Sequence, residues 1–153
     1  MISDYFAELF VAGLFADNDW NVYFPHRDKG FDFIISKRIG EVEIIRPVQV
    51  KGKYPTDNKT DKSKYGYIGE LTRTHEDMIL AIPYFNNFRR DGTDLIAFMP
   101  FHTIKPHSKG FRCEPAMFKN GFAIPRRDYR QYFGDNGLVL LEENLNVTHI
   151  NLD

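Results

Sequence analysis

Apolar residues at helical spacing open the chain, within DYFAELFVAGLFA at positions 4–16. The residues at the i, i+3, i+4, i+7 and i+8 positions of a buried stripe are Phe6, Leu9, Phe10, Gly13 and Leu14. Ser3 or Asp4 would cap the N-terminus of this helix. Its other sides are also apolar, so we expect most of the helix surface to be buried.

Three runs of strand-like composition follow the helix and predict a β-sheet. They are WNVYFP at 20–25, FDFIIS at 31–36 and VEIIRPVQVK at 42–51. A short basic turn around Arg38 and Gly40 joins the second run to the third. Strands joined by so short a turn must be antiparallel, so we expect an antiparallel pair here.

Weaker patterns follow in the rest of the chain. Residues 54–64 are polar and predict an exposed loop. Thr74 and Asp77 have the spacing of a capping box and predict a short helix over 74–85, which Pro83 would end. The other predictions are a short strand at 65–72, a buried strand at 93–101, helical spacing at 126–133, a strand LVLL at 138–141 and a further strand VTHINL at 147–152.

The predicted order of elements is helix, three strands, helix and strand, followed by a C-terminal extension. This order indicates an α/β fold with a mixed central β-sheet flanked by helices. At 153 residues the chain is long enough to bury a single core, and no repeat or linker divides it. We therefore expect one domain over residues 1–153, with its core at about 1–105 and a C-terminal elaboration at about 106–153.

Composition places the chain among soluble globular proteins. Apolar residues make up 42% and charged residues 27% of the sequence. The single cysteine, Cys113, excludes an internal disulfide and favours a reducing compartment, with a buried core position as its simplest role. No secretory signal and no apolar run long enough for a membrane span are present, so we expect a cytoplasmic protein without membrane contact.

Charge is unevenly distributed, although the net charge is only −1. Residues 37–64 carry 8 basic and 4 acidic side chains, and residues 101–134 carry 7 basic and 2 acidic ones. These two basic segments would form a phosphate-binding face if the fold brings them together, or ordinary solvated loops if it does not.

Four polar residues stand out against these apolar elements. Glu8 is the only charged side chain between Tyr5 and Ala16. We therefore expect it to pair with another charged group, to lie on an exposed strip of the helix or to belong to a polar site. Asp32 opens the second strand. Gln49 and Lys51, two residues apart near the end of the third strand, share one of its faces.

Together, Glu8, Asp32, Gln49 and Lys51 resemble the motif of the PD-(D/E)xK nuclease superfamily, which includes many restriction endonucleases and Holliday-junction resolvases. The motif consists of a helix glutamate, an aspartate near the start of the second strand and (D/E)-x-K on the third strand. The resemblance covers about residues 1–105 and implies a restriction-endonuclease-like αβββαβ core, which is the order read from the chain.

The resemblance implies a Mg²⁺-dependent (or Mn²⁺-dependent) endonuclease that hydrolyses phosphodiester bonds in DNA. Asp32, Gln49, Glu8 and the backbone carbonyl of Val50 would hold the metal ion. Lys51 would position the attacking water and stabilise the charge that develops on the phosphate.

Gln49 departs from the motif, because its neutral amide replaces an acid and should weaken metal binding. The alternatives are a catalytically silent nucleic-acid-binding module on the same fold, or a nuclease that acts on RNA. Asp28 is a second candidate for the aspartate, and His26 is a candidate phosphate contact. The resemblance also implies a homodimer.

The basic and aromatic residues define the expected nucleic-acid interface. The candidates near the central strands and the following loop are Lys37, Arg38, Lys53, Lys59, Lys62 and Lys64. The candidates in the C-terminal part are Arg126, Arg127 and Arg130, which are interleaved with Tyr129 and Tyr132.

Overall fold

The structure is a computed structural model of the 153-residue chain. It describes residues 5–27, 30–55, 67–71, 73–85, 95–108 and 110–143. The expected helix cap at Ser3 or Asp4 and the expected strand at 147–152 lie outside these ranges.

The predicted first helix is present as α1, Tyr5–Asp17, but it buries a different face from the one expected. Its buried residues are Ala7, Val11, Ala12 and Phe15. Phe6 and Leu9, which belong to the predicted stripe, are 39% and 61% exposed. The stripe prediction is wrong because this helix is apolar on nearly every side, so spacing alone could not select the buried face.

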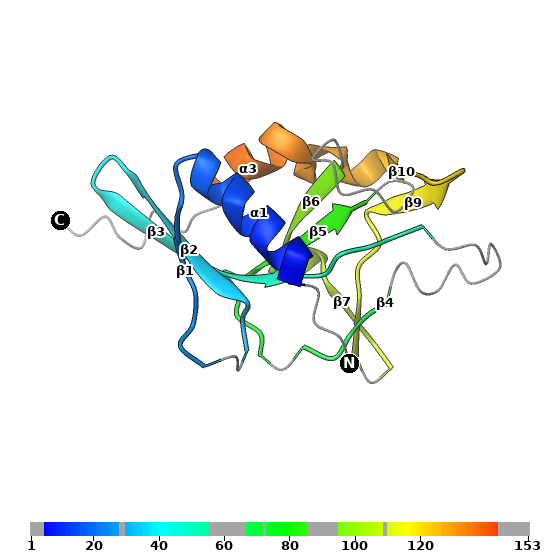
Figure 1. Ribbon diagram of the computed structural model, residues 1–153, viewed down its shortest axis with the longest axis horizontal. Helices are drawn as coiled ribbons and strands as arrows, with labels where there is room; N and C mark the ends of the chain where they lie inside the picture. The colour runs from blue at the N-terminus through cyan, green and yellow to red at the C-terminus, as the bar shows by residue number, and fades with distance from the viewer. Residues whose placement is uncertain are drawn as a thin grey trace.

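A five-stranded sheet forms the centre of the fold (Figure 1). In spatial order its strands are β1, Asn21–Tyr23; β2, Phe33–Ile39; β3, Val42–Val50; β5, Ile79–Tyr84; and β6, Leu95–Pro100. Only β3 and β5 pair in parallel, and the other neighbours are antiparallel. The expected mixed sheet and the expected antiparallel pairing of β2 with β3 are therefore confirmed.

Two predicted elements are wrong. The helix expected over 74–85 is the strand β5, whose six residues are all buried, with one face toward each layer of the core. A strand buried on both faces has a continuous apolar run, which periodicity cannot distinguish from a short buried helix. The strand expected at 138–141 lies instead within the helix α3, Gly134–Glu143.

Helices cover one face of the sheet, and strands cover the other. Buried residues of α1 and α3 share one hydrophobic cluster with Phe33, Val48 and Val50. The opposite face packs against the C-terminal part of the chain and contains Leu80 and Ile82 of β5. The expectation of a mixed α/β fold is confirmed, but the described residues between β3 and β5 contain no helix.

The second layer consists of short elements that the sequence patterns did not predict, apart from the strand near 65–72 and the helical turn near 126–133. They are β4, Tyr67–Gly69; η2, Phe101–Thr103; β7, Lys105–His107; β8, Gly110–Arg112; β9, Ala116–Lys119; β10, Phe122–Pro125; and η3, Arg127–Tyr132. They place the C-terminal basic segment on the face of the sheet opposite the helices.

Candidate functional site

Asp32 and Gln49 meet where β2 begins and β3 ends. The Asp32 carboxylate accepts a hydrogen bond of 2.7 Å from the backbone N–H of Val50 and one of 3.1 Å from the side-chain nitrogen of Gln49. The backbone N–H of Asp32 donates to the carbonyl of Val48 at 2.9 Å, which continues the ladder between the strands. The carboxylate is thus held at a set position by both backbone and side chain.

The remaining polar atom of the Gln49 amide, Oε1, is buried and has no hydrogen-bond partner among the described residues. A buried acceptor without a donor costs about 1–3 kcal/mol, so such an atom calls for a ligand. A carboxylate oxygen and an amide oxygen are the hard ligands that Mg²⁺ prefers. In this structure Gln49 turns its amide nitrogen toward Asp32, so its buried oxygen would share a cation with Asp32 only after the amide reorients, and it would supply no negative charge.

Lys51 and Lys53 extend the same line of side chains. The segment after β3 continues alongside β5, because the N–H of Lys51 donates to Ala81 and that of Lys53 donates to Pro83. Alternation along an extended chain then puts Gln49, Lys51 and Lys53 on one face. This is the face opposite α1, since Val48 and Val50 pack with the helix.

The Lys53 amine lies in an unusual electrostatic environment. Burial, followed by repulsion from Lys51, lowers the pKa of Lys53 to about 8, while Cys113 and Glu114 act in the opposite direction. Lys53 is therefore near enough to both lysine and acid to respond to their charges. Residues that are far apart in the sequence meet at this point.

Glu114 joins this cluster to two arginines. One of its carboxylate oxygens accepts a hydrogen bond of 2.9 Å from Arg112, and the other accepts one of 2.8 Å from Arg126. A single carboxylate thus binds two cations, Arg112 and Arg126, so this group keeps a positive charge. Arg126 was an expected nucleic-acid contact, whereas Arg112 and Glu114 were not identified from the sequence.

The environment also suppresses ionisation of two neutral groups. Burial raises the pKa of the Cys113 thiol to about 12, and it also raises the pKa of the Tyr84 hydroxyl. Both groups respond to charges in the same cluster. Cys113 is 4% exposed, which agrees with the buried position expected for it.

Glu8 lies on α1, whose first turn reaches the same end of the sheet. Phe6 and Tyr54 both contact the ring of Phe85, which directly follows β5, at centroid distances of 5.7 Å and 5.1 Å. The helix covers the face opposite Gln49, however, and the described residues contain no group of three acidic, histidine or cysteine side chains that could hold a metal ion. A metal-binding role for Glu8 stays a prediction.

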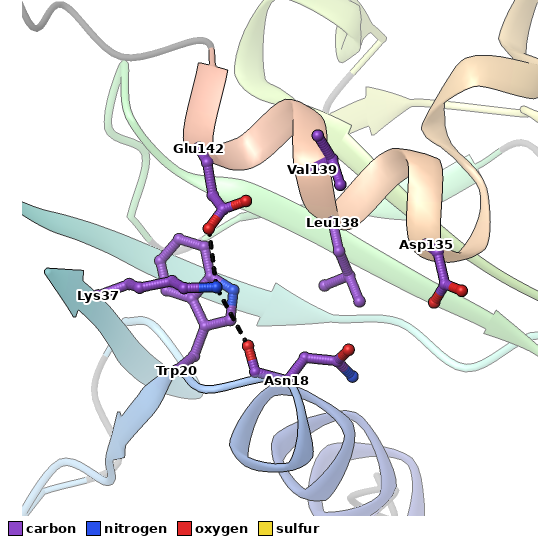
Figure 2. A pocket seen from close by; sticks show the side chains of 7 residues that line it. All are labelled: Asn18, Trp20, Lys37, Asp135, Leu138, Val139 and Glu142. Carbon is purple, nitrogen blue, oxygen red and sulfur yellow. Dashed lines mark hydrogen bonds and ion pairs between the residues drawn. The ribbon is translucent and has the colours of Figure 1, made fainter. Parts of the chain in front are cut away.

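Two expected nucleic-acid contacts lie away from this cluster. Lys37 points to the helical face, where it forms a 2.7 Å ion pair with Glu142 of α3 and a 3.3 Å hydrogen bond to the carbonyl of Asn18 (Figure 2). Its amine also lies 5.6 Å from the centroid of the Trp20 ring. Arg38 is exposed near the β2–β3 turn, six residues and roughly 20 Å along the strand from Asp32.

Among the remaining expected residues, Tyr129 and Tyr132 are half-buried, and the others are exposed or lie outside the described ranges. His26, Arg127 and Arg130 are exposed. Asp28, Lys59, Lys62 and Lys64 are not among the described residues.

Arg73 is a further residue near the site that sequence patterns did not indicate. Its guanidinium lies 5.8 Å from the centroid of the Phe31 ring, next to Asp32. Its side chain also packs against Gly30, whose φ of +111° suits glycine, and an added Cβ there would lie 3.1 Å from Arg73 Cδ. Only the tertiary structure brings Arg73 to the start of β2.

A scan of family models found no match to this chain, and a search of curated proteins found none either. Within the described ranges, no helix combines the length and apolar character that a membrane crossing requires.

Proposed function

We propose that this protein is a metal-dependent endonuclease that acts on DNA. The observation that carries the proposal is the Asp32 carboxylate, held by the Val50 N–H, beside the buried and unpartnered Oε1 atom of Gln49. Two lysines follow Gln49 on the same face. The carboxylate and the amide oxygen would ligate a metal ion, and the amines would stabilise phosphate charge, as suits metal-assisted phosphodiester hydrolysis.

Asp32 and Gln49 would hold the divalent cation through oxygen atoms. The Val50 carbonyl is a third candidate, because the N–H and C=O of one strand residue point toward the same neighbouring strand and the Val50 N–H points to Asp32. When bound, Mg²⁺ would polarise a phosphate oxygen and lower the pKa of a bound water. Glu8 would add a fourth ligand, directly or through water, only if it reaches around the end of β3.

Lys51 would orient the attacking water and stabilise negative charge on the phosphate. Its ammonium is a compact donor on a flexible stem, which suits contact with a phosphate oxygen that shifts during the reaction. Lys53 lies next along this face, so both ammonium groups would attract the negatively charged substrate. A restriction-endonuclease-like core and a cytoplasmic location remain part of this proposal.

Cleavage of supercoiled plasmid tests the proposal. With Mg²⁺ or Mn²⁺ present, the wild-type protein should nick plasmid, whereas Asp32→Asn and Lys51→Ala should lower the rate by at least about 100-fold. The asparagine side chain keeps an oxygen for the Val50 N–H, so the fold should persist. Asp17→Asn and Lys105→Ala, which change exposed residues, are matched controls. Equal cleavage by all variants would exclude this site, and a parallel RNA substrate separates the two nuclease alternatives.

A second candidate, a catalytically silent nucleic-acid-binding module, is favoured by one observation. The Gln49 amide nitrogen donates to Asp32, so this carboxylate is stabilised without a cation. Under this alternative, wild-type protein binds DNA with no cleavage at any metal concentration. Cleavage gained by Gln49→Glu would then identify Gln49 as the residue that silences the site.

A further inference from the structure

The β9–β10 hairpin carries an exposed apolar face that the fold does not use. Its register pairs Lys119 with Phe122 and Met117 with Ile124 across the two strands. The turn residues Asn120 and Gly121 have φ values of 54° and 83°. Positive φ at both central residues is typical of a tight hairpin with a two-residue turn.

The hairpin has two unlike faces because side chains alternate along each strand. One face packs into the core through the buried residues Ala116 and Ala123 and the half-buried Phe118. The other face is exposed, with Met117 at 37%, Phe122 at 53% and Ile124 at 48% of their full accessibility. Lys119 is exposed beside them. These three apolar side chains lie together on one face, as is typical of a surface that contacts a partner.

The charge beside this face indicates the kind of partner. Lys119 lies on the face itself, and the exposed Arg126 and Arg127 directly follow β10. Arg126 shares the single carboxylate of Glu114 with Arg112, so this group keeps a net positive charge. A partner that complements both features must combine dense negative charge with flat apolar surfaces.

Single-stranded nucleic acid has this combination, because its phosphates are anionic and its base faces are accessible for stacking. A regular duplex offers the phosphates but stacks its bases against one another. If duplex DNA were bound, the exposed side chains of Phe122, Met117 and Ile124 would stay largely in contact with solvent.

The hairpin also adjoins the two arginines of the candidate site. Arg126 directly follows β10 and donates a hydrogen bond of 2.8 Å to Glu114, which also accepts one of 2.9 Å from Arg112. The yellow strands of the hairpin project at the right of Figure 1. A nucleic-acid strand bound along the hairpin would therefore meet Arg126 and Arg112 at the end of β10.

We propose that the β9–β10 hairpin binds unpaired bases of a nucleic-acid substrate, with Phe122 as the stacking residue and Arg112 and Arg126 as phosphate contacts. This inference rests on the proposed function and deepens it by naming its substrate class: nucleic acid with a single-stranded region, such as a flap, gap or branch. Phe122 is a positioning residue here, since it would contact bases away from the reacting phosphate.

Fluorescence anisotropy in EDTA tests binding separately from cleavage. The probes are a labelled oligothymidine of about 20 nucleotides and a labelled duplex of the same length. Both probes are longer than the binding site of a single stacking platform. Phe122→Ala should weaken binding of the single strand about tenfold and of the duplex less than about twofold, as expected for loss of one stacked base. Val139→Ala, which changes an exposed apolar residue of α3, is the matched control and should leave both affinities unchanged.

Phe122→Trp provides an independent readout that does not depend on a destabilised hairpin. The natural chain has a single tryptophan, Trp20, which is buried, so added oligothymidine should selectively quench the emission of the indole introduced at position 122. Unquenched emission, or equal losses on single strand and duplex in Phe122→Ala, would overturn the inference. So would binding to phosphatidylserine vesicles with none to oligothymidine.

The two proposals fail in different ways. Asp32-dependent cleavage with no effect of Phe122→Ala on single-strand binding would remove the hairpin role and keep the nuclease. Phe122-dependent binding without cleavage by any metal would remove the nuclease and keep the hairpin role.

Discussion

The side-chain nitrogen of Gln49 donates a hydrogen bond of 3.1 Å to the Asp32 carboxylate, so an amide and an acid form the central pair of the site. Two carboxylates at this separation would repel each other unless a cation or a proton lay between them. With glutamine, the pair is hydrogen-bonded without a metal ion. Under the proposed function, the neutral residue at position 49 would lower metal affinity and stabilise the metal-free protein.

Gln49→Glu should make stability depend on metal. Without metal, we expect a loss of about 1–3 kcal/mol, because a hydrogen bond is replaced by contact between two carboxylates. Added Mg²⁺ should restore the stability and raise the melting temperature more than in the wild type. Differential scanning fluorimetry across a Mg²⁺ titration measures both effects. Gln131→Glu, at an exposed position of η3, is the control, and an identical metal response in both variants would exclude Gln49 as a ligand.

Nucleic-acid affinity should fall as the pH rises through about 8, where the pKa of Lys53 lies. The amine is charged and able to bind phosphate below that pH and neutral above it, and loss of one phosphate contact corresponds to roughly three- to tenfold in Kd. Anisotropy in EDTA between about pH 7 and pH 9.5 spans this titration. Lys53→Arg stays charged over the whole range and should bind equally at both ends; a drop of the same size in that variant would mean that another group titrates.

The same lysine gives stability a defined pH dependence. Its pKa of about 8 in the folded protein is below its unfolded value of about 10.4, so the unfolded chain holds more protons between these values. The contribution of Lys53 to stability is therefore fully present above the unfolded pKa and is lost as the pH falls toward the folded one. Relative to Lys53→Met, the wild-type midpoint for urea unfolding should rise between about pH 8 and pH 10. A constant difference would mean that the pKa of Lys53 is not shifted.

Arg46→Met should destabilise the fold by about 3 kcal/mol. Arg46 is 4% exposed and donates hydrogen bonds to the carbonyls of Leu141, at 3.1 Å, and Asp77, at 3.2 Å. It thus joins β3 to the end of α3 and to the loop before β5, and its loss leaves buried carbonyls without donors. Urea unfolding gives the change in free energy. Arg38→Met, at the exposed hairpin turn, should change stability by less than about 0.5 kcal/mol.

Two glycine-to-alanine substitutions in the helices should act in opposite directions. At Gly137 of α3, an added Cβ would lie 2.2 Å from the carbonyl oxygen of Tyr132, so we expect a loss of about 2 kcal/mol or more. At Gly13 of α1, an added Cβ would meet nothing within 4 Å, so we expect a gain of about 0.5–1 kcal/mol. Midpoints of urea unfolding compare the two. A stabilised Gly137→Ala variant would contradict the close approach of η3 to α3.

The β2–β3 hairpin, which the sequence predicted correctly, is controlled by local contacts. The short turn after Ile39 pairs this residue with Val42, and equal steps outward from the turn bring Phe33 opposite Val48, next to Asp32 and Gln49. Hairpin geometry therefore brings Asp32 and Gln49 close together. The Asn120-Gly121 pair is a similar local signal for the β9–β10 hairpin.

The tertiary structure determined three features that the local sequence pattern could not: the type of one element, the buried face of α1 and the packing of distant segments. Whether the run at 79–84 became a strand or a helix depended on burial between two layers, since an apolar run has no periodicity to distinguish them. The buried face of α1 depended on the sheet beneath it, because nearly all its sides were apolar. The packing of Cys113, Ala116 and Ala123 against Leu80 and Ile82 required the C-terminal strands to fold back over β5, a contact between distant segments that sequence spacing does not encode.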